Sequence, residues 1–382
     1  MKYRKFGRLD WEPSALGFGC MRLPSRDNQP MSAKIDEELA IRMIRHAIDS
    51  GVNYIDTAYP YHQGSSEIVV GKALGDGYRE RVMLADKLPV WLVNEPADFD
   101  RLLNEQLDKL KTDHIDFYLL HALTRKRWTD HVLRYGLIEK AESAIRDGRI
   151  RYLGFSFHDS YEVFEEIIKA HDWTFCQIQY NYMDIRNQAG VKGLKLAAEK
   201  GIGVIVMEPL LGGHLANPPA MVRTAMDEVA DRYTPAGLAL NWIWNQPEVS
   251  LVLSGMSTME QVEENLHAAE ISAPGIFTTS EKKAIAGLRK NYRAGIAVPC
   301  TNCKYCMPCP HGVDIPANFE FFNHAHLYND LPAAKFRYSI YLTPAQRSDK
   351  CIACKECEEK CPQEIKISTL MPKVSELLSP AK

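Results

Sequence analysis

Three titratable residues close apolar segments in the first third of the chain, and a tyrosine follows the first of them. Asp56, Lys87 and His121 each end a short run of apolar residues typical of a buried strand. Tyr61 follows Asp56 within a segment whose proline and glycine are typical of a loop. Buried strands ordinarily end in turn residues, so these four side chains are candidate catalytic residues.

The four residue types suit the protonation of a carbonyl oxygen. Reduction of a carbonyl needs a hydride donor and an acid that protonates the developing alkoxide. A tyrosine titrates near pH ~10 when unperturbed, so we expect the Lys87 ammonium to lower the pKa of Tyr61 and Asp56 to keep that ammonium charged. His121 would orient the carbonyl oxygen. Any one of these residues alone is an ordinary strand-end polar group, and only spacing favours Tyr61 over Tyr59 as the acid.

In their order and setting, the four residues resemble the catalytic tetrad of the aldo-keto reductases. Residues 55–58 read Ile-Asp-Thr-Ala, and Gly64 and Glu67 follow Tyr61, as is typical of that family. The resemblance covers residues 1–275. It implies an α/β fold, a nicotinamide dinucleotide cofactor (NADP or NAD) and a small-molecule carbonyl or alcohol substrate.

Strands and helical patterns alternate through the same part of the chain. A hairpin is expected in residues 1–15, and a helical pattern runs from Asp36 to Ser50 before Gly51. Eight strand–helix units predict a (β/α)8 TIM barrel, in which the strand-end residues meet at one mouth. The predicted strands are 15–21, a second ending at Asp56, 82–87, 115–121, 152–157, 174–180, 203–207 and 250–255.

The resemblance places the cofactor at the ends of strands five to eight. Ser156 and Gln177 stand where the family holds the nicotinamide carboxamide. After strand eight, small and hydroxyl residues open a helical run, and backbone amides at a helix N-terminus can hold a phosphate. An ordinary helix cap is the alternative reading of that segment. The residues expected to contact the adenosine end are Gly255, Met256, Ser257, Gln261, Glu264 and Asn265.

The sequence departs from the family pattern in three places. Met207, Glu208, Pro209 and Leu210 stand where a tyrosine commonly stacks on the nicotinamide, and Ser156-Phe157 replaces a Ser-Asn pair. Gln261 stands where an arginine often binds the 2′-phosphate. We therefore expect only weak discrimination between NADPH and NADH.

Eight of the ten cysteines lie between residues 300 and 361. They form two runs, each ending in Cys-Pro; the second has the spacing of bacterial ferredoxins, and the first differs only in that its last spacing is one residue shorter. The two runs are Cys300, Cys303, Cys306 and Cys309, and then Cys351, Cys354, Cys357 and Cys361. Two zinc sites are the alternative, because paired Cys-x2-Cys also suits zinc. The third cysteine at the same interval and the Cys-Pro endings favour two [4Fe–4S] clusters.

The ferredoxin resemblance implies crossed ligation, in which the last cysteine of each run binds the other cluster. Cys361 would complete the cluster of the first run, and Cys309 that of the second. A helical stretch between the runs, near residues 318–327, predicts a small, mainly α-helical ferredoxin-like module. The expected domains are a barrel at 1–275, a linker helix at 276–298 and the iron–sulfur domain at 299–382.

The composition is that of a globular protein. The 382 residues include 46 basic and 49 acidic side chains, which argues against electrostatic binding of nucleic acid. No apolar run approaches the ~20 residues that span a bilayer. The N-terminus has no apolar signal region, and we expect a cytoplasmic protein.

The combined motifs predict an oxidoreductase that reduces a carbonyl or oxidises an alcohol and carries two clusters for electron transfer. Nicotinamide moves two electrons as hydride, whereas each cluster accepts one, and a flavin normally joins the two. A ferredoxin-linked reductase with a bound or partner flavin, served by an electron-transfer protein, is therefore the alternative, although no flavin motif is present. An electron carrier or nucleotide-sensing scaffold is the non-enzyme alternative, which does not require an intact tetrad.

Overall fold

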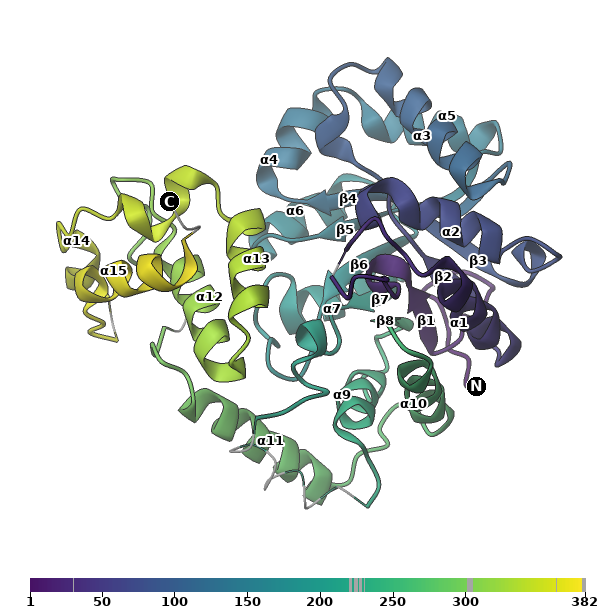
Figure 1. Cartoon of the computed structure of the whole chain (residues 1–382). Coiled ribbons are helices and arrows are strands. Elements are labelled where there is room, and N and C mark those ends of the chain that lie inside the picture. Colours follow the sequence, from purple (N-terminus) through teal and green to yellow (C-terminus); the bar gives the residue numbers. More distant parts are fainter. Residues whose placement is uncertain are drawn as a thin grey trace. The chain divides into compact units, whose positions relative to one another are not determined.

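Eight parallel strands close into a barrel in the N-terminal part of the chain (Figure 1). The computed structural model describes residues 1–29, 31–219, 222, 226, 229, 231–300, 305–361 and 363–379. Each strand pairs with the next, and β8 returns to β1, where Leu16 pairs with Val252. The strands are β1 (Leu16–Gly19), β2 (Tyr54–Asp56), β3 (Met83–Leu88), β4 (Ile115–Leu123), β5 (Ile150–Phe157), β6 (Phe175–Gln179), β7 (Gly203–Met207) and β8 (Leu251–Gly255).

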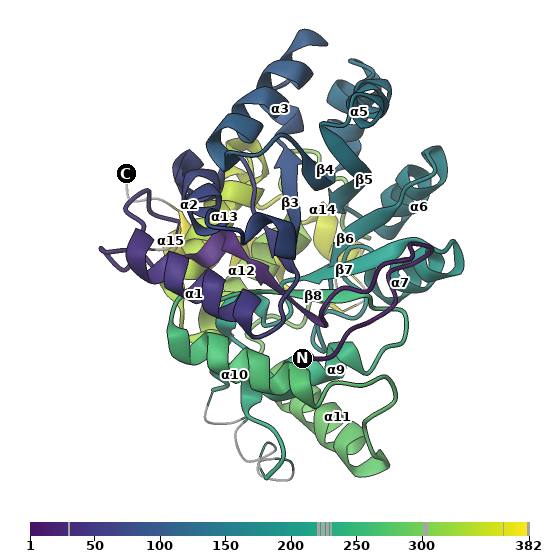
Figure 2. The ribbon, with the colours of Figure 1, turned by 90° about the vertical axis from the view of Figure 1, so that its right-hand side faces the viewer.

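Helices surround the strands, as the turned view shows (Figure 2). They are α1 (Glu37–Asp49), α2 (Ser65–Ala73), α3 (Ala97–Leu110), α4 (Arg125–Arg127), α5 (Leu137–Arg146), α6 (Tyr161–Ala170), α7 (Gly190–Glu199), α9 (Pro235–Trp244) and α10 (Met259–Glu270). The predicted TIM barrel is confirmed.

Apolar periodicity explains how each helix packs on the barrel, and α1 is the clearest case. The Asp36 side chain caps its N-terminus by accepting a hydrogen bond from Leu39 N. Gly51, with a φ of +99°, follows its end. The face between these signals is buried against the strands through Ala40, Met43, Ile44, Ala47 and Ile48.

Aromatic rings fill the interior of the barrel. Phe6 precedes the first strand and packs against Phe117 and Phe175, with ring centroids 5.2 and 6.2 Å away. A Cβ on Gly203 would lie 2.3 Å from the Phe6 ring, so only glycine leaves room for it. Antiparallel bridges Tyr3–Ser14 and Phe6–Leu9 form the expected N-terminal hairpin. These rings belong to an apolar core inside the barrel.

The fourth strand extends further than the sequence predicts. It continues past His121 to Leu123, and its pairing with β5 shifts register between Leu120 and Leu123. Ala122 adopts a φ of +53° there and donates its N–H to Ser156 Oγ at 2.6 Å. His121 therefore lies at an irregularity within the strand rather than at its end.

The contacts divide the chain into two compact units, Met1–Asn217 with Arg232–Thr279, and Pro218–Asp231 with Ser280–Lys382. The second unit is helical, and the helix expected near residues 318–327 lies within α12. Its helices are α11 (Thr279–Ala294), α12 (Ile315–Tyr328), α13 (Leu331–Tyr341), α14 (Glu356–Glu359) and α15 (Ile367–Leu378). The proposed domain boundaries at residues 275 and 299 stay a prediction.

The second unit has its own apolar core. Phe319 of α12, Tyr338 of α13 and Met371 of α15 are fully buried in one cluster. The Tyr338 hydroxyl donates to Asn318 Oδ1 at 3.0 Å and accepts from Ser348 N at 3.0 Å. These bonds attach the segment that leads into the second cysteine run. Among the described residues, no helix combines the length and the apolar character needed to cross a bilayer.

Candidate functional site

Lys87 lies at the centre of the candidate active site. Its Nζ donates to Asp56 Oδ1 at 2.6 Å and to Thr57 O at 2.7 Å, and it lies 3.4 Å from the Tyr61 hydroxyl. Lys87, Asp56 and Tyr61 are 0, 2 and 9% exposed. In this setting the ammonium keeps its full charge close to the phenol and is shielded from water.

A strained turn positions Tyr61. The residue begins a short 3-10 helix (Tyr61–Gly64) in which His62 and Gln63 have φ values of +50° and +56°. Such left-handed residues cost roughly 1–3 kcal/mol each and persist where the surroundings fix them. His62 Nδ1 is fixed by the Ser32 carbonyl at 2.7 Å. The neighbouring Tyr59 instead donates its hydroxyl to Glu105 Oε2 at 3.0 Å, so Tyr61 is the tyrosine that faces Lys87.

His121 lies beside the phenol. Its ring packs edge-on against Tyr61 with centroids 6.1 Å apart, and it lies 5.2 Å from the Trp91 ring. Burial, followed by the charges of Lys87, His158 and Arg127, holds the pKa of His121 well below its usual range. The imidazole is therefore neutral at physiological pH. Its Nδ1 has no hydrogen-bond partner among the described residues.

Burial changes the expected acidity of Tyr61. It raises the pKa of Tyr61 above its ordinary value, and the Lys87 charge opposes this rise without cancelling it. Burial also raises the pKa of Asp56 against the pull of Lys87. For Lys87, burial would lower the pKa, but the charges of Asp56 and Tyr61 outweigh it and raise the net value. Lys87 therefore lowers the Tyr61 pKa as expected, but desolvation of the phenolate, which the expectation left out, outweighs this effect.

The predicted nicotinamide residues lie on neighbouring strands. Ser156 of β5 pairs with Gln177 of β6, and Gln177 Nε2 lies 3.5 Å from Met207 Sδ of β7. Gln177 Oε1 is buried with no donor among the described residues, which suits an acceptor for a carboxamide N–H. Pro209 and Leu210 continue from β7 into a turn. Asn181, which no sequence motif marks, is fully buried beside them and donates to the Glu208 carbonyl at 3.3 Å.

The segment after β8 is organised around the start of α10. Thr258 caps the helix by accepting from Gln261 N, and Gln261 Oε1 accepts from Ser257 N at 2.8 Å. Gly255 and Met256 lead into this cap, and Glu264 is half-buried on the helix. Asn265 is buried and donates to Ser254 Oγ at 2.7 Å. Its amide nitrogen therefore already has a partner within the barrel.

A basic residue, Arg22, lies beside the segment that joins β8 to α10 and was not among the predicted cofactor contacts. The Arg22 side chain lies against Gly255, where an added Cβ would be 3.2 Å from its Cβ and Cγ. Ser257 Oγ donates to the Arg22 carbonyl at 2.8 Å. Because Arg22 is distant in sequence from the helix, a search of the β8–α10 motif could not find it.

Four of the predicted cluster cysteines line one cavity in the second unit. They are Cys309 from the first run and Cys351, Cys354 and Cys357 from the second. Burial and then the charges of Cys351, Cys309 and Cys354 raise the pKa of Cys357 to about 11, against a lowering backbone hydrogen bond. Cysteines that line one cavity in this way fit a bound cation or cluster, whose binding would deprotonate them.

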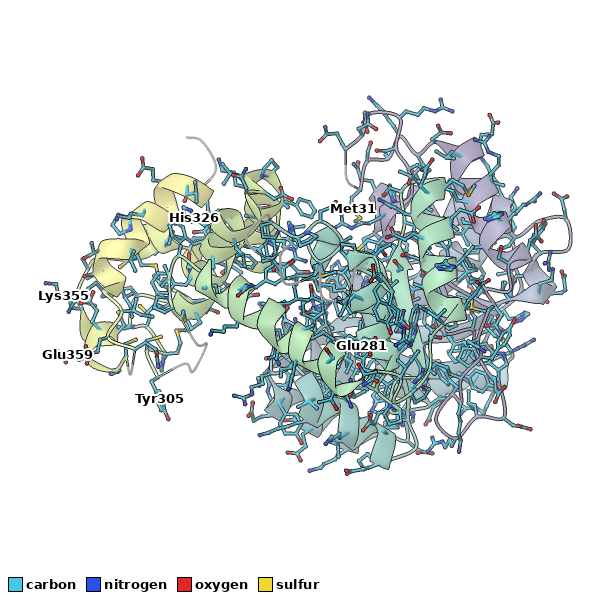
Figure 3. All side chains as sticks on the ribbon, turned by 90° about the horizontal axis from the view of Figure 1, so that it is seen from below. Met31, Glu281, Tyr305, His326, Lys355 and Glu359 are labelled. Atoms are coloured by element: carbon cyan, nitrogen blue, oxygen red, sulfur yellow. The ribbon has the colours of Figure 1, made fainter. Side chains whose placement is uncertain are left out.

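Zinc would hold its sulfur ligands about 2.3 Å from one point. No three His, Cys, Asp or Glu side chains in the described part of the chain are placed to bind a single ion. The cavity lies near the surface, because Cys354 is exposed and Ile352 is 63% exposed. Lys355 and Glu359 project outward from the same segment (Figure 3).

The other predicted cysteines are only partly described. Cys306 is buried in the core of the second unit, and Cys300 and Cys361 pack against the same core. Cys303 lies outside the described residues.

Both the barrel and the cysteine-rich part of the chain match known protein families. Residues 15–275 match the model of the "Aldo/keto reductase family". Residues 299–365 match that of the "4Fe-4S dicluster domain".

Among related sequences, the uncharacterized oxidoreductases YqkF and YrpG of Bacillus subtilis are 30 and 28% identical. Their alignments cover 75 and 71% of this chain and 95 and 92% of theirs.

Solved structures give the same result. The holo form of aldo-keto reductase AKR11C1 from Bacillus halodurans has a TM-score of 0.63 and 29% identity, covering 75% of this chain and 96% of its own. An aldo-keto reductase from Klebsiella pneumoniae in complex with NADPH has a TM-score of 0.61 and 25% identity, covering 75 and 95%. The chain therefore belongs to the aldo/keto reductase family of oxidoreductases and carries a 4Fe-4S dicluster domain after its barrel.

Proposed function

We propose that the barrel catalyses nicotinamide-dependent reduction of a small-molecule carbonyl, or the reverse oxidation of an alcohol. The observation that carries this proposal is the contact of Lys87 Nζ with Asp56 and Tyr61, with His121 against the Tyr61 ring. A nicotinamide dinucleotide bound at Ser156 and Gln177 would supply or accept the hydride. The NADPH complex of the Klebsiella relative supports that assignment.

The chain's own residues would perform the proton chemistry. The neutral His121 would bind the substrate oxygen and orient it toward the Tyr61 hydroxyl. Tyr61 would donate its proton to the oxygen as the carbonyl carbon becomes tetrahedral, which leaves a phenolate. Lys87 would stabilise that phenolate with its charge, while Asp56 and the Thr57 carbonyl keep the ammonium in place. Each turnover would end when the phenolate regains a proton from solvent.

We further propose two [4Fe–4S] clusters in the second unit. The cavity lined by Cys309, Cys351, Cys354 and Cys357 supports one of them and the crossed ligation expected of it. A reducing compartment such as the cytoplasm would suit these clusters, because cysteines there stay reduced. Cys309, Cys351, Cys354 and Cys357, which line the cavity, form no disulfide. The exposed segment around Ile352 and Cys354 would allow electron exchange with a partner protein.

The dicluster domain also supports a second candidate function. Clusters exchange single electrons, so a ferredoxin-linked reductase with a bound or partner flavin would use both units. Anaerobic mixing with NADH or NADPH, with and without added flavin and a panel of aldehydes and ketones, separates the two. Turnover of a carbonyl without flavin supports the first function. Cluster bleaching that requires flavin, without any carbonyl turnover, supports the second.

A further inference from the structure

A buried pair of carboxyl groups lies on the outer face of β3, directly beside the tetrad. Asp86 precedes Lys87 in the strand, so its side chain points away from the barrel interior. It meets Glu67 of α2, and both side chains are fully buried. The Asp86 and Glu67 carboxyl groups interact with each other. Carboxylate oxygens only accept hydrogen bonds, so the two groups can bond directly only when one of them carries a proton.

The remaining contacts identify which group is protonated. Glu67 Oε2 forms an ion pair with Lys109 Nζ at 2.7 Å, so this cation lies against Glu67. Within the described part of the chain, Asp86 Oδ1 accepts only from the Lys87 backbone N–H, at 2.8 Å. Asp86 Oδ2 and Glu67 Oε1 have no donor there. Burial, and then the charge of Glu67, raises the pKa of Asp86 well above its ordinary value. The shared proton therefore belongs to Asp86.

The charges around the pair balance only when Asp86 is neutral. The titratable groups that face it are Lys109 from α3, Tyr118 from β4, Cys20 after β1, and the tetrad members Asp56, Tyr61 and Lys87. Burial is the main cause that raises the pKa of Tyr118 and of Cys20 well above their ordinary values, so both stay neutral. Lys109 then pairs with Glu67, and Lys87 with Asp56. An ionised Asp86 would be a surplus negative charge, and its field raises the pKa of Tyr61.

We propose that Asp86 and Glu67 are positioning residues that share one proton, which keeps Asp86 neutral and leaves the Lys87 charge to act on Tyr61. The kinetic consequence rests on the proposed carbonyl or alcohol chemistry, whereas the protonation itself does not. Gln106 completes the arrangement by joining the Lys87 carbonyl to the Tyr118 hydroxyl, at 3.1 and 2.6 Å.

Infrared spectroscopy of the full holoprotein at neutral pH tests the protonation directly. We expect a protonated-carboxyl C=O band that shifts in D2O, is absent from Asp86→Asn and is lost in Glu67→Gln. In the latter variant a glutamine N–H would bond to Asp86 and favour its ionised form. Glu105→Gln on α3 is the control that keeps the band. Absence of the band from the wild-type protein overturns the proposal without any variant, and persistence of the band in Asp86→Asn overturns the assignment to Asp86.

Kinetics separate this electrostatic role from simple packing. The Tyr61 phenolate accepts the proton in alcohol oxidation, so a rise of roughly one pH unit in its pKa slows the reaction about tenfold at a fixed pH below it. We expect that loss in Glu67→Gln, and recovery of most of it in Glu67→Gln/Asp86→Asn, where the surplus charge is gone. Equal slowing of the single and double variants overturns the proposal. If the wild-type protein turns over no carbonyl or alcohol, the proposed function fails, and the infrared result still decides the protonation.

Discussion

Replacing Lys87 by methionine tests how the site makes Tyr61 act as an acid. The Nζ atom lies 3.4 Å from the Tyr61 hydroxyl, and both groups are buried. At an effective dielectric constant of ~20, two unit charges at that separation interact by about 5 kcal/mol, which corresponds to roughly three to four pH units. Asp56 would take up a proton once its partner is gone, and its opposing field would then disappear. We therefore expect the pKa of Tyr61 to rise by roughly one to three pH units in Lys87→Met.

The pH dependence of alcohol oxidation measures this rise. The reaction needs the phenolate, so its rate increases with pH through the Tyr61 pKa, and the whole profile should move to higher pH in the variant. Loss of one partner of a buried ion pair costs roughly 3–5 kcal/mol of stability, so the assay is run well below the unfolding temperature of the variant. Lys72→Met is the matched control, because it removes only an exposed pair with Glu37. An unchanged pH profile in Lys87→Met would refute the electrostatic role of the lysine.

Three further predictions concern the clusters, the cofactor and the buried carboxyl pair. Anaerobically purified protein should contain about eight irons and eight sulfides, and Cys354→Ala about four of each, by chemical analysis; stoichiometric zinc instead would contradict the cluster assignment. Binding titrations should show weak discrimination between NADPH and NADH because Gln261 is not basic, and strong NADPH preference that Arg22→Ala abolishes would assign the 2′-phosphate to Arg22. The raised pKa of Asp86 means that the folded protein favours the protonated carboxyl group. Asp86 therefore adds its full contribution to the free energy of unfolding at pH values below 3.8, the pKa of the unfolded state. That contribution is lost as the pH rises through the folded-state pKa. Asp86→Asn should flatten that pH dependence in denaturant titrations, and an unchanged slope would show that Asp86 is ionised in the native state.

The periodicity of apolar residues was sufficient to predict the barrel, because each apolar strand and each amphipathic helix has its own local sequence pattern. The α1 helix shows this, since its cap at Asp36 and its stop at Gly51 are both readable from residue type. Polar residues at the ends of β2 and β3 likewise mark the mouth, because parallel strands bring those ends together.

Contacts between residues far apart in the sequence could not be predicted, because no local sequence pattern indicates them. The pairing of Asp86 with Glu67 joins a strand to a helix that precedes it, and neither residue departs from an ordinary pattern. The net pKa of Tyr61 could not be predicted, because it depends on how completely the barrel excludes water from the phenol.

The central claim is that Tyr61 protonates a carbonyl while a nicotinamide supplies the hydride. Single-turnover reduction of an active aldehyde by Tyr61→Phe, compared with wild-type protein and Tyr59→Phe, tests it most directly. General acid catalysis typically contributes ~10²–10⁴-fold, so the Tyr61→Phe rate should fall by that order, with nicotinamide affinity nearly unchanged. Tyr59→Phe should stay near the wild-type rate, because its hydroxyl faces Glu105. Full carbonyl reduction by Tyr61→Phe would contradict the account.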